Sequence, residues 1–197
     1  GAKDDAAGLA ISSRMTSQIR GLEVGIRNAN DAISMISTAD GALVEVTNML
    51  QRMRELALQS ANGTTTEADR NYLNKEYANL IGEIERIATN TQWNGRNILD
   101  GAANGTGDTT VKFQVGANGG QTVAVDFGNI SQDSGSGTTQ FETFENSGTL
   151  AAGSFITAGT TASALTTASA AITKIDSAIT AVNTQRATFG AAMNQLT

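Results

Sequence analysis

A stripe of mostly apolar residues, spaced alternately by four and three positions, runs along each end of this chain. A 3.5-residue repeat held over several turns is typical of long α-helices that bury one edge against partner helices. The N-terminal stripe includes Asp40, and its main apolar members are Leu22, Ile26, Ile33, Ile36 and Leu43. The C-terminal stripe includes Arg186, and its main apolar members are Ile172, Ile175, Ile179 and Val182. The pattern predicts that the two ends of the chain pack side by side as helices.

The composition removes most catalytic and metal-binding chemistry. The 197 residues include no cysteine and no histidine, so disulfides, thiolate or imidazole metal ligands and histidine-dependent triads are excluded. Asp100, Asn104 and Asp108 place oxygen atoms in a glycine-rich stretch, but their spacing does not match an EF-hand, and a turn-rich loop is favoured over a calcium site. We therefore predict a protein that is not an enzyme and has no cofactor and no metal site.

The charge pattern bears on partners. The formal net charge is −6, and both halves of the chain are mildly acidic without a basic stripe. This argues against nucleic acid or an anionic membrane as a partner. No apolar run approaches the roughly 20 residues of a membrane span, so membrane insertion is not expected.

Three helices are predicted. The first covers about residues 4–60, with Asp4 and Asp5 as caps, and Asn62 with Gly63 is expected to end it through a left-handed backbone. Thr64 with Glu67 is expected to form a capping box for a second helix over about 66–89, whose apolar face includes Ile84. The short connection makes these two helices antiparallel neighbours. The third helix is expected to begin near 161–163.

A β-hairpin is predicted between the second and third helices. After a turn at 93–95, the apolar residues alternate with polar ones in two runs, which is typical of a hairpin with one apolar face: Val111, Phe113 and Val115, then Val123, Val125 and Phe127. Because an isolated hairpin is marginal in water, it should lie on the helices. Residues 131–160 are too polar to assign, and Phe141, Phe144 and Phe155 are candidates for anchoring them.

These elements together predict a mainly α fold with a small β part. We expect an elongated antiparallel helical bundle, or coiled coil, of three long helices plus a β-hairpin region. Residues 1–100 and 161–197 would form the helical rod domain, and residues 101–160 would form the hairpin and a short variable region rich in Gly, Ser and Thr.

Two features of the first helix suggest contacts beyond its apolar stripe. Arg52 and Leu56 are four positions apart, so they are expected to form one exposed or half-exposed patch. Gly21 and Gly25 form a small-xxx-small pattern, which we interpret as a close backbone approach between packed helices.

Several stretches of the sequence resemble bacterial flagellin. They lie at residues 2–11, 27–31, 50–62, 91–95, 113–118 and from 170 onward, in the order that the family has them. The resemblance implies a structural subunit of the flagellar filament, exported through the flagellar secretion channel without a cleaved secretory signal peptide and polymerised outside the cell by helix packing. It also implies longer terminal assembly segments, which this chain lacks, so we expect the chain alone to stay monomeric.

The resemblance further suggests partners. Other flagellin subunits are the first, and Toll-like receptor 5 is the second, with Arg52, Leu56 and Glu76 at positions implicated in receptor or subunit contact. Two alternatives stay open: a cell-surface module that binds glycans such as a polysaccharide through residues 131–160, and a hook–filament junction protein.

Overall fold

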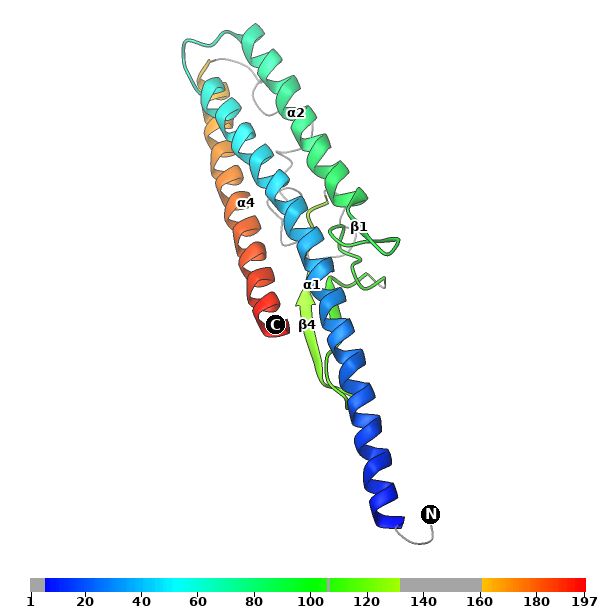
Figure 1. Cartoon of the computed structure of the whole chain (residues 1–197). Coiled ribbons are helices and arrows are strands. Elements are labelled where there is room, and N and C mark those ends of the chain that lie inside the picture. Colours follow the sequence, from blue (N-terminus) through cyan, green and yellow to red (C-terminus); the bar gives the residue numbers. More distant parts are fainter. Residues whose placement is uncertain (1–5, 106, 132–160) are drawn as a thin grey trace.

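The protein is an elongated bundle of three long helices with two small β-hairpins on one side (Figure 1). The computed structural model describes residues 6–105, 107–131 and 161–197. Its helices are α1 (Ala6–Ser60), α2 (Glu67–Asn90) and α4 (Thr161–Leu196). Its strands are β1 (Gln92–Trp93), β2 (Arg96–Asn97), β3 (Thr110–Gln114) and β4 (Thr122–Asp126). This arrangement confirms the predicted fold class. The expected caps at residues 4, 5 and 161–163 and the anchors Phe141, Phe144 and Phe155 lie outside the residues, or side chains, that the structure describes.

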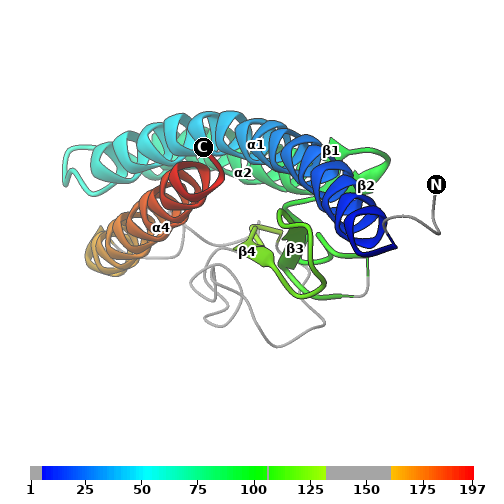
Figure 2. The same cartoon turned by 60° about the horizontal axis from the view of Figure 1, so that its bottom comes forward.

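α1 is one continuous helix of 55 residues. At a rise of 1.5 Å per residue it is about 80 Å long, and the chain has no proline to interrupt it. Its first half extends beyond α2 and α4 (Figure 1), and the whole helix curves gently (Figure 2). We call residues 6–27 of α1 the arm and the remaining described residues the body.

The turn between α1 and α2 differs from the prediction. Neither Asn62 nor Gly63 has a left-handed backbone. The capping box uses Thr66 and Asp69: the Thr66 hydroxyl accepts a hydrogen bond from the Asp69 N–H at 3.3 Å, and the Asp69 carboxylate accepts one from the Thr66 N–H at 3.3 Å. The expected box of Thr64 with Glu67 is wrong because Glu67 is the first helical residue, too early to be the third.

A buried arginine closes the same turn. Arg70 donates from Nε to the carbonyl oxygen of Ser60 at 3.1 Å and from Nη2 to that of Asn62 at 3.3 Å. A helix end leaves carbonyl groups without intrahelical partners, and a guanidinium there satisfies them and opposes the negative end of the helix dipole.

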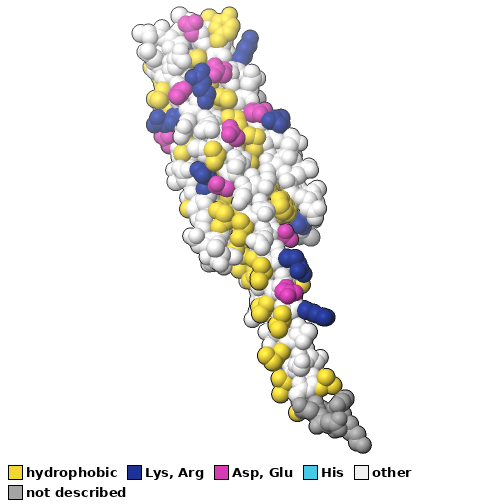
Figure 3. Space-filling view, in the orientation of Figure 1, with side chains coloured by type: hydrophobic (Ala, Val, Ile, Leu, Met, Phe, Trp, Pro, Cys, Tyr) yellow, Lys and Arg dark blue, Asp and Glu magenta, His cyan; other side chains and the backbone are white. Residues whose placement is uncertain are grey.

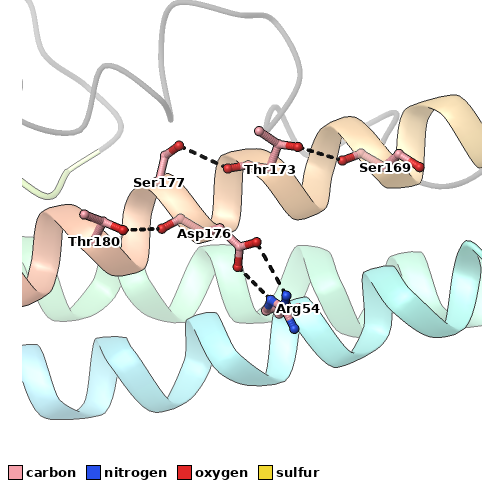
Figure 4. A network of polar contacts seen from close by, with 6 residues as sticks. All are labelled: Arg54, Ser169, Thr173, Asp176, Ser177 and Thr180. Carbon is pink, nitrogen blue, oxygen red and sulfur yellow. Dashed lines mark hydrogen bonds and ion pairs between the residues drawn. The ribbon is translucent and has the colours of Figure 1, made fainter.

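α4 runs antiparallel to α1, and two ion pairs join them. Arg54 Nε lies 2.6 Å from Asp176 Oδ1 (Figure 4), and Arg186 Nε lies 2.7 Å from Asp40 Oδ1. Asp40 and Arg186 are the charged positions of the two predicted stripes, and they pair with each other. Between these pairs the buried residues of α1 are apolar, and they are Leu43, Val46, Leu50 and Met53.

The predicted hairpin is confirmed as β3 and β4, which pair antiparallel. Val111 lies opposite Val125 and Phe113 opposite Val123, so the apolar alternation falls on one face. Phe127, just after β4, packs against Phe189 of α4 with ring centroids 5.4 Å apart. Gln185 of α4 donates from Nε2 to the Asp126 carbonyl oxygen at 2.6 Å. The hairpin therefore lies on the helices, as expected.

The hairpin tip approaches α1 at the small-xxx-small pattern. A Cβ added at Gly25 would overlap the carbonyl oxygen of Val115 and lie 2.9 Å from its carbonyl carbon, and one added at Gly21 would lie 3.0 Å from the Ala117 Cβ. Asn28 donates from Nδ2 to the Gln114 carbonyl oxygen at 2.8 Å. The close approach is real, but its partner is the backbone of a hairpin, and the expected second helix is wrong.

The segment after α2 adds core residues that the sequence pattern did not reveal. β1 and β2 are joined by Asn94 (φ 50°) and Gly95 (φ 76°), the backbone signs of a tight two-residue hairpin turn. Ile98, Leu99 and Ala103 that follow are fully buried. The Leu99 carbonyl oxygen accepts a hydrogen bond from the Ile130 N–H at 2.9 Å, which closes this segment against the end of the second hairpin.

We predict that Gly25→Ala and Gly41→Ala have opposite effects. The methyl group at position 25 meets the Val115 backbone, so the free energy of unfolding should fall by about 1–3 kcal/mol. Nothing lies within 4 Å of a Cβ at position 41, and alanine there should raise it by up to about 1 kcal/mol. Urea unfolding followed by circular dichroism measures both. Equal changes in the two variants would contradict the tight contact.

Candidate functional site

The predicted stripe residues lie in two environments. Ile36 and Leu43 of α1, Ile84 of α2, and Ile175 and Val182 of α4 are buried. Ile33, Ile172 and Ile179 are half-buried. Leu22 and Ile26, in contrast, are 51% and 64% exposed. The expectation that the stripe is covered along its length is therefore wrong for these two residues in the described structure.

The direction and position of α4 explain that exposure. α4 is antiparallel to α1, and Arg186 already pairs with Asp40. The ten helical residues after Arg186 extend only about 15 Å further. The C-terminus accordingly lies beside the middle of α1 (Figure 1), and the arm projects past it.

The arm carries an exposed apolar face. Its large apolar side chains are each about half exposed or more (Figure 3). At helical spacing Ile11, Met15, Ile19, Leu22 and Ile26 share this face, whereas Leu9 and Val24 lie off it. An exposed apolar face of this kind marks a surface that packs against a partner. No helix among the described residues is long and apolar enough to cross a membrane.

Arg52 and Glu76 lie together, but Leu56 does not join them. Arg52 Nη2 lies 2.7 Å from Glu76 Oε1 on α2, and its Nη1 lies 2.9 Å from Glu55 Oε2. Both side chains of the Arg52–Glu76 pair are about half exposed. Leu56 is 0% exposed, because it lies on the side of α1 that faces the core. The prediction that Leu56 belongs to an exposed patch is wrong.

Several hydroxyl groups on the surface of α4 form hydrogen bonds within the helix. The hydroxyl groups of Thr173, Ser177 and Thr180 donate to the carbonyl oxygens four residues earlier (Figure 4). Beside them, the hydrogen bond that Arg54 donates to the Asp176 carboxylate raises the pKa of Arg54, and the one that Arg186 donates to the Asp40 carboxylate raises the pKa of Arg186. These arginines stay charged at any physiological pH.

Two open pockets lie on the body. One, of about 380 Å³, is lined by Asp31, Trp93 and Asn94. The other, of about 440 Å³, lies at the α1–α2 turn and is lined by Gln59, Asn62, Thr64, Thr65, Asp69, Tyr72 and Leu73. No group of three or more Asp or Glu side chains that could hold a metal occurs in residues 6–105, 107–131 and 161–197.

The side-chain oxygens of Asp100, Asn104 and Asp108 accept hydrogen bonds within their own loop. Asp100 accepts hydrogen bonds from Asn97 Nδ2 and the Ala102 N–H. Asn104 accepts one from the Asp108 N–H, and Asp108 accepts one from the Thr110 N–H. They build the turns of the loop, which is the interpretation that their spacing favoured.

Comparison with known proteins gives a family match over more than half of the chain. Residues 1–104 match the family model of the bacterial flagellin N-terminal helical region. B-type flagellin of Pseudomonas aeruginosa is 52% identical over 130 residues, which cover 66% of this chain and 26% of that protein. Flagellin of Halalkalibacterium halodurans is 53% identical over 125 residues, which cover 64% of this chain and 44% of that protein. The matched region thus spans less than half the length of these relatives.

Solved structures show the same fold. The crystal structure of Bacillus cereus flagellin superposes with a TM-score of 0.64 at 34% identity, covering 87% of this chain and 85% of that chain. The structure of FliC from Burkholderia pseudomallei superposes with a TM-score of 0.61 at 28% identity, covering 83% and 99%.

We predict that Leu56→Ala, in the core, lowers the free energy of unfolding much more than Arg52→Ala, on the surface. Leu56→Ala should lower the free energy of unfolding by about 2–5 kcal/mol, because it leaves a cavity in a packed core. Arg52→Ala should change stability little, because solvent screens an exposed ion pair. Chemical denaturation of each variant gives both values. A larger loss for Arg52→Ala would reverse the assignment.

We also predict a pH-dependent contribution from Asp69. Hydrogen bonds from the Thr66 side chain and then its backbone hold the pKa of Asp69 below its ordinary value of 3.8. A carboxylate whose pKa is lowered by folding stabilises the native state fully above its unfolded-state pKa, and this stabilisation is lost as the pH falls through the folded-state pKa. Stability measured at about pH 6 and about pH 2 should therefore decline more in the wild type than in Asp69→Asn. Glu67→Gln, in the same helical turn, is the control and should decline like the wild type.

Proposed function

Because the chain belongs to the bacterial flagellin family, we propose that it is part of a structural subunit of the bacterial flagellar filament. The subunit acts outside the cell by self-assembly through helix packing, and the proposal assigns it no catalytic step and no cofactor. The observation that carries the proposal is the exposed apolar face of the arm, which extends the same stripe that α2 and α4 cover in the body.

The physical properties of the body suit such a role. A filament subunit has to transmit force along its length, and three helices packed along one continuous core give a rigid rod. Two ion pairs also join α1 and α4 on the surface of the body. The arm leaves apolar surface available for a partner helix, and burial of that surface yields about 25 cal/mol per Å².

We predict that charges placed on the apolar face of the arm prevent assembly without unfolding the body. Met15→Asp with Ile19→Asp in the full-length protein should abolish filaments seen by electron microscopy, because the contact would bury two carboxylates. Ser13→Asp with Ser17→Asp adds the same charge at exposed polar positions of the arm and should leave filaments intact. Filaments of normal yield from the Met15, Ile19 variant would contradict the proposed role of the arm.

The route of export is part of the proposal. We propose that the subunit reaches the cell exterior without removal of a secretory signal peptide, as the family resemblance implies. Mass spectrometry of protein sheared from cells would give the mature N-terminus. A processed N-terminus at a small-residue cleavage site would contradict this route.

A second proposed partner is Toll-like receptor 5, through Arg52 and Glu76. What supports it is that the two residues form one half-exposed pair across α1 and α2. Leu56 is excluded as a direct contact because it is buried. Arg52→Ala with Glu76→Ala should weaken receptor activation by the intact protein in a reporter-cell assay. Arg54→Ala with Asp176→Ala, which removes the other exposed pair, should leave activation unchanged.

The remaining partner hypothesis is that residues 131–160 bind surface glycans. Its residues, 131–160, lie almost wholly outside the described structure, and no contact among the described residues favours it. The hook–filament junction alternative is likewise not favoured by any relative reported above.

A further inference from the structure

Three unpaired polar groups line the pocket beside the β1–β2 turn. The pocket has a volume of about 380 Å³ and is lined by Asp31 of α1, Trp93 and Asn94. Among the described residues, the Asp31 carboxylate and the Trp93 indole N–H form no hydrogen bond or ion pair, and neither does the Asn94 side chain. Asn94 is held at a positive φ of 50° by the tight turn, which fixes its place at the pocket edge.

This combination suits a guanidinium group. A carboxylate accepts two parallel hydrogen bonds from arginine, and the face of an indole attracts a cation and stacks on the guanidinium plane. An amide oxygen such as that of Asn94 can accept a further N–H.

The chain carries unpaired arginines of its own. Arg52, Arg54, Arg86 and Arg186 pair with carboxylates, and Arg70 and Arg96 donate to carbonyl oxygens. Arg14, Arg20 and Arg27 form no hydrogen bond or ion pair with any residue that the structure describes. All three lie on the arm.

The arm and the body are opposite in charge. The arm has three arginines and one glutamate, whereas the remaining described residues have nine basic and thirteen acidic side chains. Arg14 and Arg20 are about 26 Å and 17 Å along α1 from Asp31, so they cannot reach the pocket of their own chain. Arg27 is one helical turn away, and it forms no ion pair with Asp31 in the described part of the chain.

We propose that the pocket of Asp31, Trp93 and Asn94 receives an arginine from the arm of a second copy of this chain. The inference rests on the proposed function and adds a residue-level contact to it. The pocket and the arm are different surfaces, so the contact is heterologous. A heterologous contact that does not close into a ring propagates into an open filament.

Charge reversal in the full-length protein tests the contact. Asp31→Arg should raise the concentration needed for filament growth, followed by light scattering, at least about tenfold, because it places like charges together. Glu45→Arg changes an exposed carboxylate on the same helix that does not line the pocket, and it should have little effect. Circular dichroism should show the same helix content in both variants.

Mixing identifies the partner arginine and shows that it belongs to another copy. Arg14→Glu, Arg20→Glu and Arg27→Glu are each mixed with Asp31→Arg. The variant that changes the partner arginine should assemble poorly alone. Mixed with Asp31→Arg it should form filaments, because the reversed charges then attract each other between different copies. No restored mixture would overturn the proposal.

Trp93 supplies an independent readout, because it is the single tryptophan of the chain. Its fluorescence should change when wild-type protein assembles, and Asp31→Arg should lose that change at the concentration where the wild type assembles. Wild-type filaments that form with unchanged Trp93 emission would overturn the pocket contact and leave the filament function standing. Failure of the wild-type full-length protein to form filaments would instead overturn the proposed function, and the contact with it.

Discussion

Burial of one edge of α1 holds this molecule together. α2, α4 and the β3–β4 hairpin all pack against α1, and the fully buried side chains of α1 from Met35 to Ala57 form the centre of the single core. The other helices and the hairpin are held by their contacts to that edge. A mutation such as Leu56→Ala therefore affects more than one interface, whereas a change on the opposite side of α1 meets only solvent.

The same edge has a different environment in the arm. From Leu9 to Ile26 its apolar side chains are exposed, although the helix itself continues without interruption. A helix of this kind keeps its backbone hydrogen bonds internally, so it can extend beyond its support. What it lacks there is apolar burial, which supplies most of the stability of helices in proteins. The arm is therefore the part of α1 that gains most from a partner.

Much of the fold follows from the sequence, and the reasons for the exceptions are physical. The heptad spacing and the absence of proline predict the long helices, and strict alternation predicts the hairpin. A spacing pattern does not say what covers a stripe, so Leu22 and Ile26 were expected to be buried. The spacing also does not say which side of a later turn of the helix faces the core. It therefore predicts Leu56 on the surface, although Leu56 is buried. For Gly21 and Gly25 the pattern indicates a close contact but not the partner.

Two signals could have improved the prediction of contacts. Asp40 and Arg186 are opposite charges in stripes expected to pack together, and they pair across α1 and α4. The second signal is the pair of apolar residues Ile98 and Leu99 just after a tight turn. Two residues are too few to show a periodicity, so a search for periodicity does not detect them. The pocket of Asp31 and Trp93 was not accessible to sequence reasoning, because it joins a helix to a turn about 60 residues later.

The distance along the chain between paired helices has a consequence for the order of folding. The Arg52–Glu76 pair joins residues 24 apart, whereas the Arg54–Asp176 and Arg186–Asp40 pairs join residues 122 and 146 apart. Closing a longer loop costs more chain entropy, and non-local contacts form late. We therefore expect the α1–α2 hairpin to form first and α4 to dock onto it afterwards.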